Sequence, residues 1–307
     1  MDFALTDEQR QLQREVRGFL AANYPLDRDW DAPPDDRWQE LAELGWLGGA
    51  ELSFVEEAIL FEESGYALYP GPFLVAVGFV LPFLGDAERE ALAAGEVRWS
   101  AEDRGLVPWL DSVDMVVDMD GNAQPARGEL LPTVDPTRPL GRLERTNGIP
   151  LPGHRDVARG RAAMAAEAVG VAQRALELGV EHAKTREQFG KKIGVYQAVS
   201  HQLADTYADV ELARSLAYWA AWCVAEEDEQ ARLAAAAAKA FATEAAVRAC
   251  ERSIQVHGGI GFTWEHVLHR LYKRALGIQA WEASSAELRE AVAAHLLDGP
   301  TFDDTGA

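Results

Sequence analysis

The chain has 307 residues, of which 48% are hydrophobic, and its formal net charge is −21. This length and composition predict a globular protein with room for more than one packed unit. The negative charge argues against a nucleic-acid partner, because phosphate binding needs a basic face. No run of eighteen apolar residues and no secretory signal pattern is found, so we expect a soluble, cytoplasmic protein without a membrane partner.

Residues 1–95 are predicted to form an all-helical N-terminal domain. Thr6 and Gln9 have the spacing of a capping box, and apolar residues then recur at helical spacing as far as Ala22. Further helices are expected over 37–47, 54–66, 73–84 and 86–94. The segment 73–84 is apolar almost throughout, which predicts a helix buried inside this domain.

Residues 96–152 have a different texture, with short β-like runs between turn residues. The strand candidates are 97–100, 115–119 and 129–131. The segment is too short for a full barrel with its own cofactor cleft. We therefore expect a reduced middle β domain.

Residues 153–299 are predicted to form a four-helix-bundle domain, because alanine, leucine, glutamate and lysine dominate long periodic segments. The expected helices are 156–185, 197–227, 231–257 and 264–275, followed by a last helix over 284–297. Residues 300–307 are expected to be a mobile acidic tail. The fold class is thus mainly α.

Two cysteines, Cys223 and Cys250, lie in alanine-rich helical sequence. Free cysteine in that setting behaves as a small buried apolar residue. A reducing compartment fits this usage, and no metal-ligand spacing is present.

Glycines follow the predicted helix 231–257. Gly258 and Gly259, with Gly261 after them, let the chain turn sharply and let a planar or pyrophosphate group approach the backbone. Glycine is also the ordinary residue at a helix C-terminus. Without other information, both explanations stay open.

A basic cluster lies between the first two bundle helices. Its members are Lys184, Arg186, Lys191 and Lys192. The cluster would attract an anionic ligand locally, although an ordinary solvated helix end explains it equally well.

Two stretches, Arg186–Gln197 and Gln255–Phe262, together with Glu282, match one pattern in order, residue type and spacing. They resemble the flavin-contacting segments of the acyl-CoA dehydrogenase family. The resemblance covers nearly the whole chain and implies an FAD cofactor and an acyl-CoA substrate, as in lipid β-oxidation.

The resemblance also implies roles for individual residues. Arg186 matches the arginine that neutralises the flavin pyrophosphate, a role that suits the fixed charge and geometry of guanidinium. Gln255 and Gly259 match residues that contact the adenine side of a cofactor held by a neighbouring subunit. The remaining predicted cofactor-binding residues are Gln188, Phe189, Gln197, Gly258 and Ser284. Phe189 is expected to pack into the bundle core as well.

Glu282 is at the spacing from Gly259 at which many family members carry the catalytic base, after an aromatic residue that is here Trp281. The reaction needs a carboxylate in a dry pocket that raises its proton affinity. The carboxylate removes the proton alpha to the thioester carbonyl, while the beta hydrogen is transferred to the flavin as hydride. Alternatively, Glu282 lies in the first turn of the last helix, where the helix dipole favours it.

Departures from the family pattern point to a heteromer. Ala283-Ser284-Ser285-Ala286 replaces the usual Gly-Thr-Ser-Glu/Gln, and the middle region retains at most Trp99–Asp103 of the ring-binding segments. The isoalloxazine ring is therefore expected to lack a site in this chain. The chain most resembles the short subunit of actinobacterial α2β2 enzymes, which pair with a longer subunit and handle bulky substrates such as sterol side chains.

The predicted function is thus a subunit of an FAD-dependent acyl-CoA dehydrogenase that introduces an α,β double bond. It would act with a longer partner or as a homo-oligomer and pass electrons to electron-transfer flavoprotein or a similar acceptor. Two alternatives stay open. One is a catalytically silent scaffold subunit, and the other is a nitroalkane oxidase-like enzyme or monooxygenase on the same fold.

Overall fold

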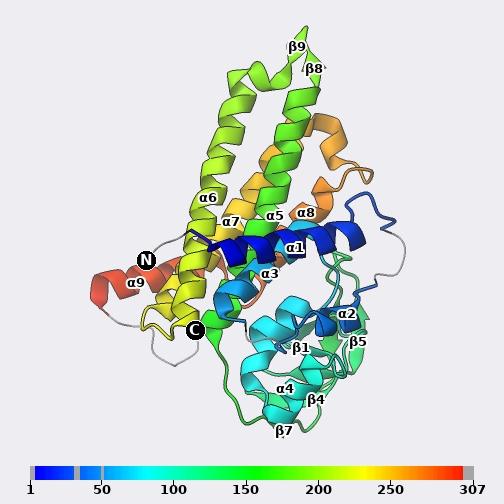
Figure 1. Cartoon of the computed structure of the whole chain (residues 1–307), viewed down its shortest axis with the longest axis vertical. Helices are drawn as coiled ribbons and strands as arrows, with labels where there is room; N and C mark the ends of the chain where they lie inside the picture. Colours follow the sequence, from blue (N-terminus) through cyan, green and yellow to red (C-terminus); the bar gives the residue numbers. More distant parts are fainter. Residues whose placement is uncertain (1–3, 31–34, 50–51, 300–307) are drawn as a thin grey trace.

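The computed structural model of the chain describes residues 4–30, 35–49 and 52–299. Helices at the N-terminus and a middle region with small sheets lie beside and below a long helical bundle (Figure 1). The fold is mainly α and confirms the predicted class. The predicted tail, residues 300–307, lies outside the described residues.

The N-terminal helices are α1 (Asp7–Asn23), α2 (Trp38–Glu43), α3 (Phe54–Ala67) and α4 (Asp86–Ala93). The predicted capping box begins α1: the Gln9 amide donates to the Thr6 hydroxyl at 3.2 Å, and the Thr6 amide donates to the Gln9 side chain at 3.1 Å. These bonds satisfy two amides that would otherwise lack partners at the helix start. The helix then buries Val16 and Leu20.

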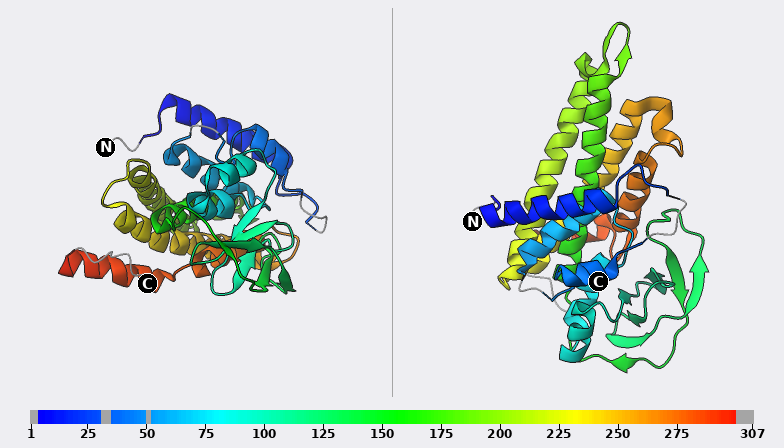
Figure 2. Two further views of the ribbon diagram at one scale, coloured as in Figure 1. Left: turned by 90° about the horizontal axis from the view of Figure 1, so that it is seen from below. Right: turned by 45° about the vertical axis from the view of Figure 1, so that its right-hand side comes forward.

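The bundle follows the predicted helices closely. Its helices are α5 (Val157–Thr185), α6 (Gln197–Ala225), α7 (Ala231–His257), α8 (Leu268–Ala280) and α9 (Ser285–Asp298). Between α5 and α6 lie β8 (Glu187–Gln188), β9 (Lys191–Lys192) and the 3₁₀ turn η3 (Ile193–Val195); the 3₁₀ turn η4 (Gly258–Phe262) follows α7. The β8–β9 hairpin stands at one extreme end of the molecule (Figures 1 and 2). We call this end, with η4, the bundle tip.

Alanine makes up much of the buried surface between the bundle helices. Ala162 and Ala165 on α5 and Ala238 and Ala242 on α7 are all fully buried. Small side chains let helix backbones approach closely, which suits long alanine-rich segments. Both cysteines are buried as predicted. Within the described residues, no helix has the length and apolar character needed to cross a membrane.

The middle region contains two small sheets. One has the order β1-β3-β4-β7 and the other β2-β6-β5, and all neighbours are antiparallel except β1 and β3. The strands are β1 (Trp99–Ala101), β2 (Leu106–Pro108), β3 (Met115–Val117), β4 (Asn122–Pro125), β5 (Gly128–Leu131), β6 (Leu140–Leu143) and β7 (Ile149–Pro150). The three predicted strands correspond to β1, β3 and β5.

The apolar segment 73–84 is helical and buried, but it is not an α-helix. It forms a π-helix, η1 (Leu74–Val80), and then a 3₁₀ turn, η2 (Leu81–Phe83). Arg159 of α5 donates to the Val77 carbonyl at 3.2 Å. A side chain at Gly78 would lie only 2.9 Å from Ala163. The segment is therefore fitted tightly against α5.

A buried ionic network joins all three parts of the chain. Arg274 of α8 donates to Glu167 of α5 at 2.8 Å, to Asp135 of the middle region at 3.1 Å and to the Tyr69 carbonyl at 3.1 Å. Arg138 also donates to Glu167. The Arg274 and Glu167 side chains are almost wholly shielded from solvent. A buried charge of this kind is tolerated only when each group is paired, as here.

Candidate functional site

Two regions contain the residues singled out from the sequence, and the first is the bundle tip. Its hairpin turns at Phe189 and Gly190, whose φ angles are 52° and 75°. Two positive φ angles are typical of a type I′ turn, which glycine adopts easily and phenylalanine does not. The Phe189 side chain is 92% exposed. The prediction that Phe189 packs into the bundle core is therefore wrong, because the turn holds its ring in solvent.

Arg186, Gln197 and Gln255 also have exposed side chains at the tip. The Arg186 amide donates to the His182 carbonyl at 2.8 Å, which continues the backbone bonding of α5 by one residue. Across the described part of the chain, the Arg186 guanidinium has no hydrogen bond or ion pair, and neither Gln197 nor Gln255 bonds through its side chain. These groups are available to a ligand or partner. Gln188 is also exposed, and its amide donates to the Glu187 carbonyl at 2.8 Å.

The glycines of η4 differ in what they contribute. Gly258 has a φ of 65°, a conformation that other residues adopt at a cost, and it ends α7. A side chain at Gly261 would lie 2.7 Å from the Ile254 carbonyl, so this glycine is needed for packing. Gly259 has no such need, because an added Cβ would meet nothing within 4 Å. The surface at Gly259 is open to an external group.

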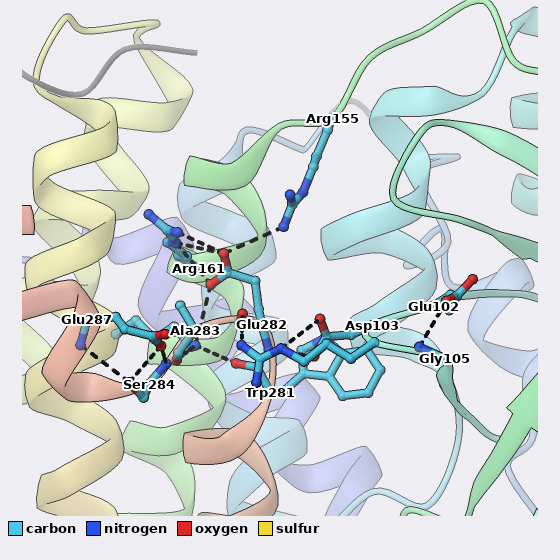
Figure 3. Close-up of polar contacts among 12 residues, drawn as sticks. Glu102, Asp103, Gly105, Arg155, Arg161, Trp281, Glu282, Ala283, Ser284 and Glu287 are labelled. Carbon is cyan, nitrogen blue, oxygen red and sulfur yellow. Dashed lines mark hydrogen bonds and ion pairs between the residues drawn. The ribbon is translucent and has the colours of Figure 1, made fainter. Parts of the chain in front are cut away.

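The second region surrounds Glu282, between α8 and α9 (Figure 3). Arg161 of α5 forms a two-pronged contact with its carboxylate, with nitrogen–oxygen distances of 2.7 and 3.0 Å. Lys239 of α7 lies 3.5 Å and Arg155 3.6 Å from the same carboxylate. The Glu282 side chain is only 6% exposed. One buried carboxylate is thus shared by three cations.

The backbone around Glu282 is also held in place. Its φ is 69°, which is unusual for a residue with a side chain. The Glu282 amide donates to Asp103 at 3.0 Å, and Arg104 donates to the Glu282 carbonyl at 3.0 Å. The Lys239 ammonium donates to the carbonyls of Trp281 and Ala283, both at 2.5 Å. A strained conformation persists where surrounding contacts determine it, as they do here.

The cleft beside Glu282 is small. Its lining includes Ala101–Asp103, which belong to the predicted remnant Trp99–Asp103 of the ring-binding segments. The apolar side chains of Phe79, Phe83, Met119 and Trp281 complete it. Its volume is about 20 Å³. That volume is room for little more than one water molecule. A tricyclic flavin ring therefore does not fit beside Glu282.

The charge state of Glu282 follows from its neighbours. Burial alone would raise the pKa of the carboxyl, but the hydrogen bonds and charge of Arg161, followed by Lys239 and Arg155, outweigh burial and hold the pKa below its ordinary value. This direction is opposite to the raised proton affinity expected of a base in a dry pocket. Burial also lowers the pKa of Lys239 to about 8, although Glu282 opposes this shift.

Comparisons with known proteins match both ends of the chain. The family model "Acyl-CoA dehydrogenase, N-terminal domain" matches residues 6–83, and "Acyl-CoA dehydrogenase, C-terminal domain" matches residues 147–297. The acyl-CoA dehydrogenase IpdE2 of Mycobacterium tuberculosis is 34% identical over 330 aligned positions, which cover 95% of this chain and 99% of the relative. The chain belongs to the acyl-CoA dehydrogenase family.

Another relative in this family is longer. The acyl-CoA dehydrogenase FadE34 of Mycobacterium tuberculosis is 32% identical over 326 aligned positions, which cover 89% of this chain but only 46% of the relative. Among solved structures, the ChsE4-ChsE5 complex from Mycobacterium tuberculosis contains a chain with a TM-score of 0.83 and 23% identity, with coverage of 98% and 100%. The steroid ACAD Tcur3481-Tcur3483 gives a TM-score of 0.79 and 24% identity, with coverage of 95% and 98%. At these identities the structures show the acyl-CoA dehydrogenase fold alone.

The acyl-CoA dehydrogenase residues predicted from the sequence fall into two groups. The tip brings together Arg186, Gln188, Phe189, Gln197, Gln255, Gly258 and Gly259. Glu282 and Ser284 lie at the other end of α8. The exposed Ser284 begins α9: its hydroxyl donates to the Glu287 carboxylate at 2.6 Å and accepts from the Glu287 amide at 3.3 Å. The roles of both groups toward a cofactor stay predictions.

Sequence reasoning did not identify Arg161 and Lys239 as partners of Glu282. It considered 158–161 only as a place for a rival base. A signal was present, since Arg161 and Lys239 are cations on otherwise alanine-rich helix faces. Long cations are almost never fully buried unless they are paired, so such positions call for a buried carboxylate.

Proposed function

We propose that this chain is one subunit of an FAD-dependent acyl-CoA dehydrogenase that introduces an α,β double bond into an acyl-CoA thioester. It would pair with a longer subunit in an α2β2 assembly. In this proposal, the bundle tip contacts the adenosine and pyrophosphate side of a flavin whose ring is held by the partner.

The observation that carries the proposal is the combination of groups left open at the tip. The Arg186 guanidinium is exposed and unpaired within the described residues, and a guanidinium suits a pyrophosphate because it is always charged and donates in a fork. Gln255 offers an unused amide, and the backbone at Gly259 is open. All three belong to segments that the family uses at a subunit interface.

The small volume of the cleft supports placing the ring and the base in the partner. Glu282 is surrounded by three cations and has a lowered pKa, so it is a weak proton acceptor. Its contacts favour the scaffold alternative over the predicted base. Catalysis by Glu282 remains the second candidate, since its position in the sequence matches the family base.

The relatives support a paired assembly and a bulky substrate. The chain corresponds to under half of FadE34, which leaves room for a second unit in that relative. Two of the solved structures with this fold carry paired names, ChsE4-ChsE5 and Tcur3481-Tcur3483, and the second is described as a steroid ACAD. We extend both features, a partner chain and a sterol-like acyl group, to this chain.

Reconstitution tests the proposal. The chain would be expressed alone and with its candidate longer partner, and the flavin absorbance per chain and acyl-CoA oxidation would be measured. We expect no flavin with the lone chain and one flavin per pair with the complex. Full loading and turnover by the lone chain would refute the heteromer. Two flavins per pair would show that the cleft beside Glu282 opens to hold a ring.

Product analysis separates the reaction classes. An enoyl-CoA product with electrons passed to electron-transfer flavoprotein, or to a similar acceptor, agrees with the proposal. An oxygenated product would instead favour a monooxygenase or nitroalkane oxidase-like enzyme on the same fold.

A further inference from the structure

Three histidine rings lie together at the base of the bundle tip, with one pair stacked and the other tilted. His182 of α5 and His257 of α7 have ring centroids 4.1 Å apart and an interplanar angle of 26°. His266, in the connection to α8, lies 4.4 Å from His257 on ring centroids. All three side chains are half-buried. We call this group the histidine stack.

The histidine stack lies directly beneath the predicted cofactor contacts. The His182 carbonyl accepts the amide of Arg186 at 2.8 Å. His257 is followed by Gly258, and a side chain on Gly261 would lie 3.0 Å from the Cβ of His257. The stack therefore joins the segment that carries Arg186 to the segment that carries Gln255 and Gly259.

One hydrogen bond favours an uncharged ring at His266. The Leu268 amide, at the start of α8, donates to Nδ1 of His266 at 3.2 Å. Protonation of that nitrogen would remove the bond and place a positive charge at the positive end of the helix dipole. His257 donates from Nδ1 to the Ser253 carbonyl at 2.7 Å, which fixes the position of its ring; this bond alone would raise the pKa of His257, but burial outweighs it.

The charged groups around the histidine stack also favour uncharged rings. The ionisable groups that act on these rings, among the described residues, are the rings themselves, Arg186 just after α5 and His269 on α8, and none is acidic. Burial, followed by the other rings, lowers the pKa of His266 to about 4. Burial also lowers the pKa of His182 and His257. The described residues contain no group of three His, Cys, Asp or Glu side chains arranged for a metal ion, so a metal site does not explain the stack.

We propose that the histidine stack is a pH-sensitive joint, which holds the two cofactor-contacting segments in register only while its rings are uncharged. His182, His257 and His266 are then positioning residues that act through Arg186 and Gly258. This inference rests on the proposed function of the tip. On acidification, like charges at ring-stacking distance repel, the segments separate, and flavin is released.

The test is the pH dependence of flavin retention in the reconstituted pair, followed by the fluorescence of released FAD. For the wild type, we expect flavin binding at about pH 4 to be at least about tenfold weaker than at pH 7.5, because charging of the stack opposes binding. His257→Phe keeps an aromatic ring in the middle of the stack but cannot be charged, so its change should be less than about threefold. The matched control His154→Phe alters an exposed histidine outside the stack and should retain the wild-type change. An equal pH dependence of flavin binding in His257→Phe and the wild type would overturn this proposal.

A second measurement does not depend on flavin. In the full chain alone, NMR titration should give half-protonation of the three rings below the ordinary histidine pKa of about 6.5. Half-protonation of the rings at or above pH 6.5 would overturn the inference. If the pair binds no flavin even at pH 7.5, the proposed function fails, while this titration still decides whether the stack has the expected charge state.

Discussion

The cleft at Glu282 and the bundle tip lie at opposite ends of α8, a helix of thirteen residues and about 20 Å in length. At the cleft, the carboxylate is surrounded by cations and little space remains. At the tip, a guanidinium and two side-chain amides are unused, and an aromatic ring is exposed in a strained turn. The comparison shows that matching family motifs at two places do not imply equal roles. A completed buried network stabilises the chain, whereas exposed groups without a protein partner are available to a ligand or partner.

The largest effect is expected for Glu282→Gln, which tests whether the network at the cleft is structural. The substitution leaves Arg161, Lys239 and Arg155 without their common counter-charge, so we expect the free energy of unfolding to fall by about 3 kcal/mol. Turnover per bound flavin in the reconstituted pair should change less than about twofold. Thermal unfolding and steady-state kinetics check the two parts. The exposed Glu229→Gln is the matched control and should change neither.

The pH dependence of this effect has a fixed sign. Because the pKa of Glu282 is lowered in the folded chain, its stabilisation is complete above the ordinary value of 4.5 and is lost as pH falls through the folded-state pKa. The stability difference between wild type and Glu282→Gln should therefore shrink in acid.

A fall in the turnover of Glu282→Gln by orders of magnitude, with flavin retained, would contradict the structural role and establish Glu282 as the base.

Arg186→Ala tests whether the exposed groups at the bundle tip bind the flavin. Because the guanidinium has no partner in the described part of the chain, its loss should leave the melting temperature nearly unchanged. Flavin binding by the pair should weaken by about 10- to 100-fold, the usual value of a charge-assisted hydrogen bond. Lys184→Ala removes another exposed cation of the same segment and should have a much smaller effect. Equal losses in the two variants would mean that only the overall charge of the segment matters.

Gly259→Ala gives a smaller and more local effect. The added methyl group meets nothing within the chain, so stability should change by less than about 1 kcal/mol. If the flavin lies against this backbone, its affinity should still fall several-fold in equilibrium titrations. Gly277→Ala is the control, because that position on α8 is equally open. Unchanged affinity in Gly259→Ala would place the cofactor away from η4.

The sequence predicts the bundle well because its signals are local. The periodicity of α5, α6 and α7 and the capping box of α1 depend on residues a few positions apart, and the structure reproduces them within one or two residues. The missed strands β2, β4, β6 and β7 are at most four residues long. β4, Asn122–Pro125, contains no β-branched or aromatic residue and is defined by its neighbours β3 and β7.

The sequence also predicts one part of the candidate site better than the other. The motif spacing identifies the tip residues, and the exposed positions of Arg186 and Gln255 agree with it. It does not reveal the state of Glu282, because Arg161 and Lys239 reach it from two other helices. Nor does it reveal that Phe189 is exposed, since the direction of its ring depends on the turn type. Contacts between distant segments therefore decide what the motif leaves open.

The network around Arg274 has a consequence for the length of this chain. If the region between α4 and α5 were deleted, Arg274 would lose Asp135 and Thr137, and Glu167 would lose Arg138. A buried cation with fewer counter-ions is costly, so such a deletion would weaken the bundle itself. The small sheets are thus retained as structural supports of the bundle, whether or not they ever face a flavin. A polypeptide without this region would first need uncharged replacements at both Arg274 and Glu167, because either group alone would be a buried charge without its partner.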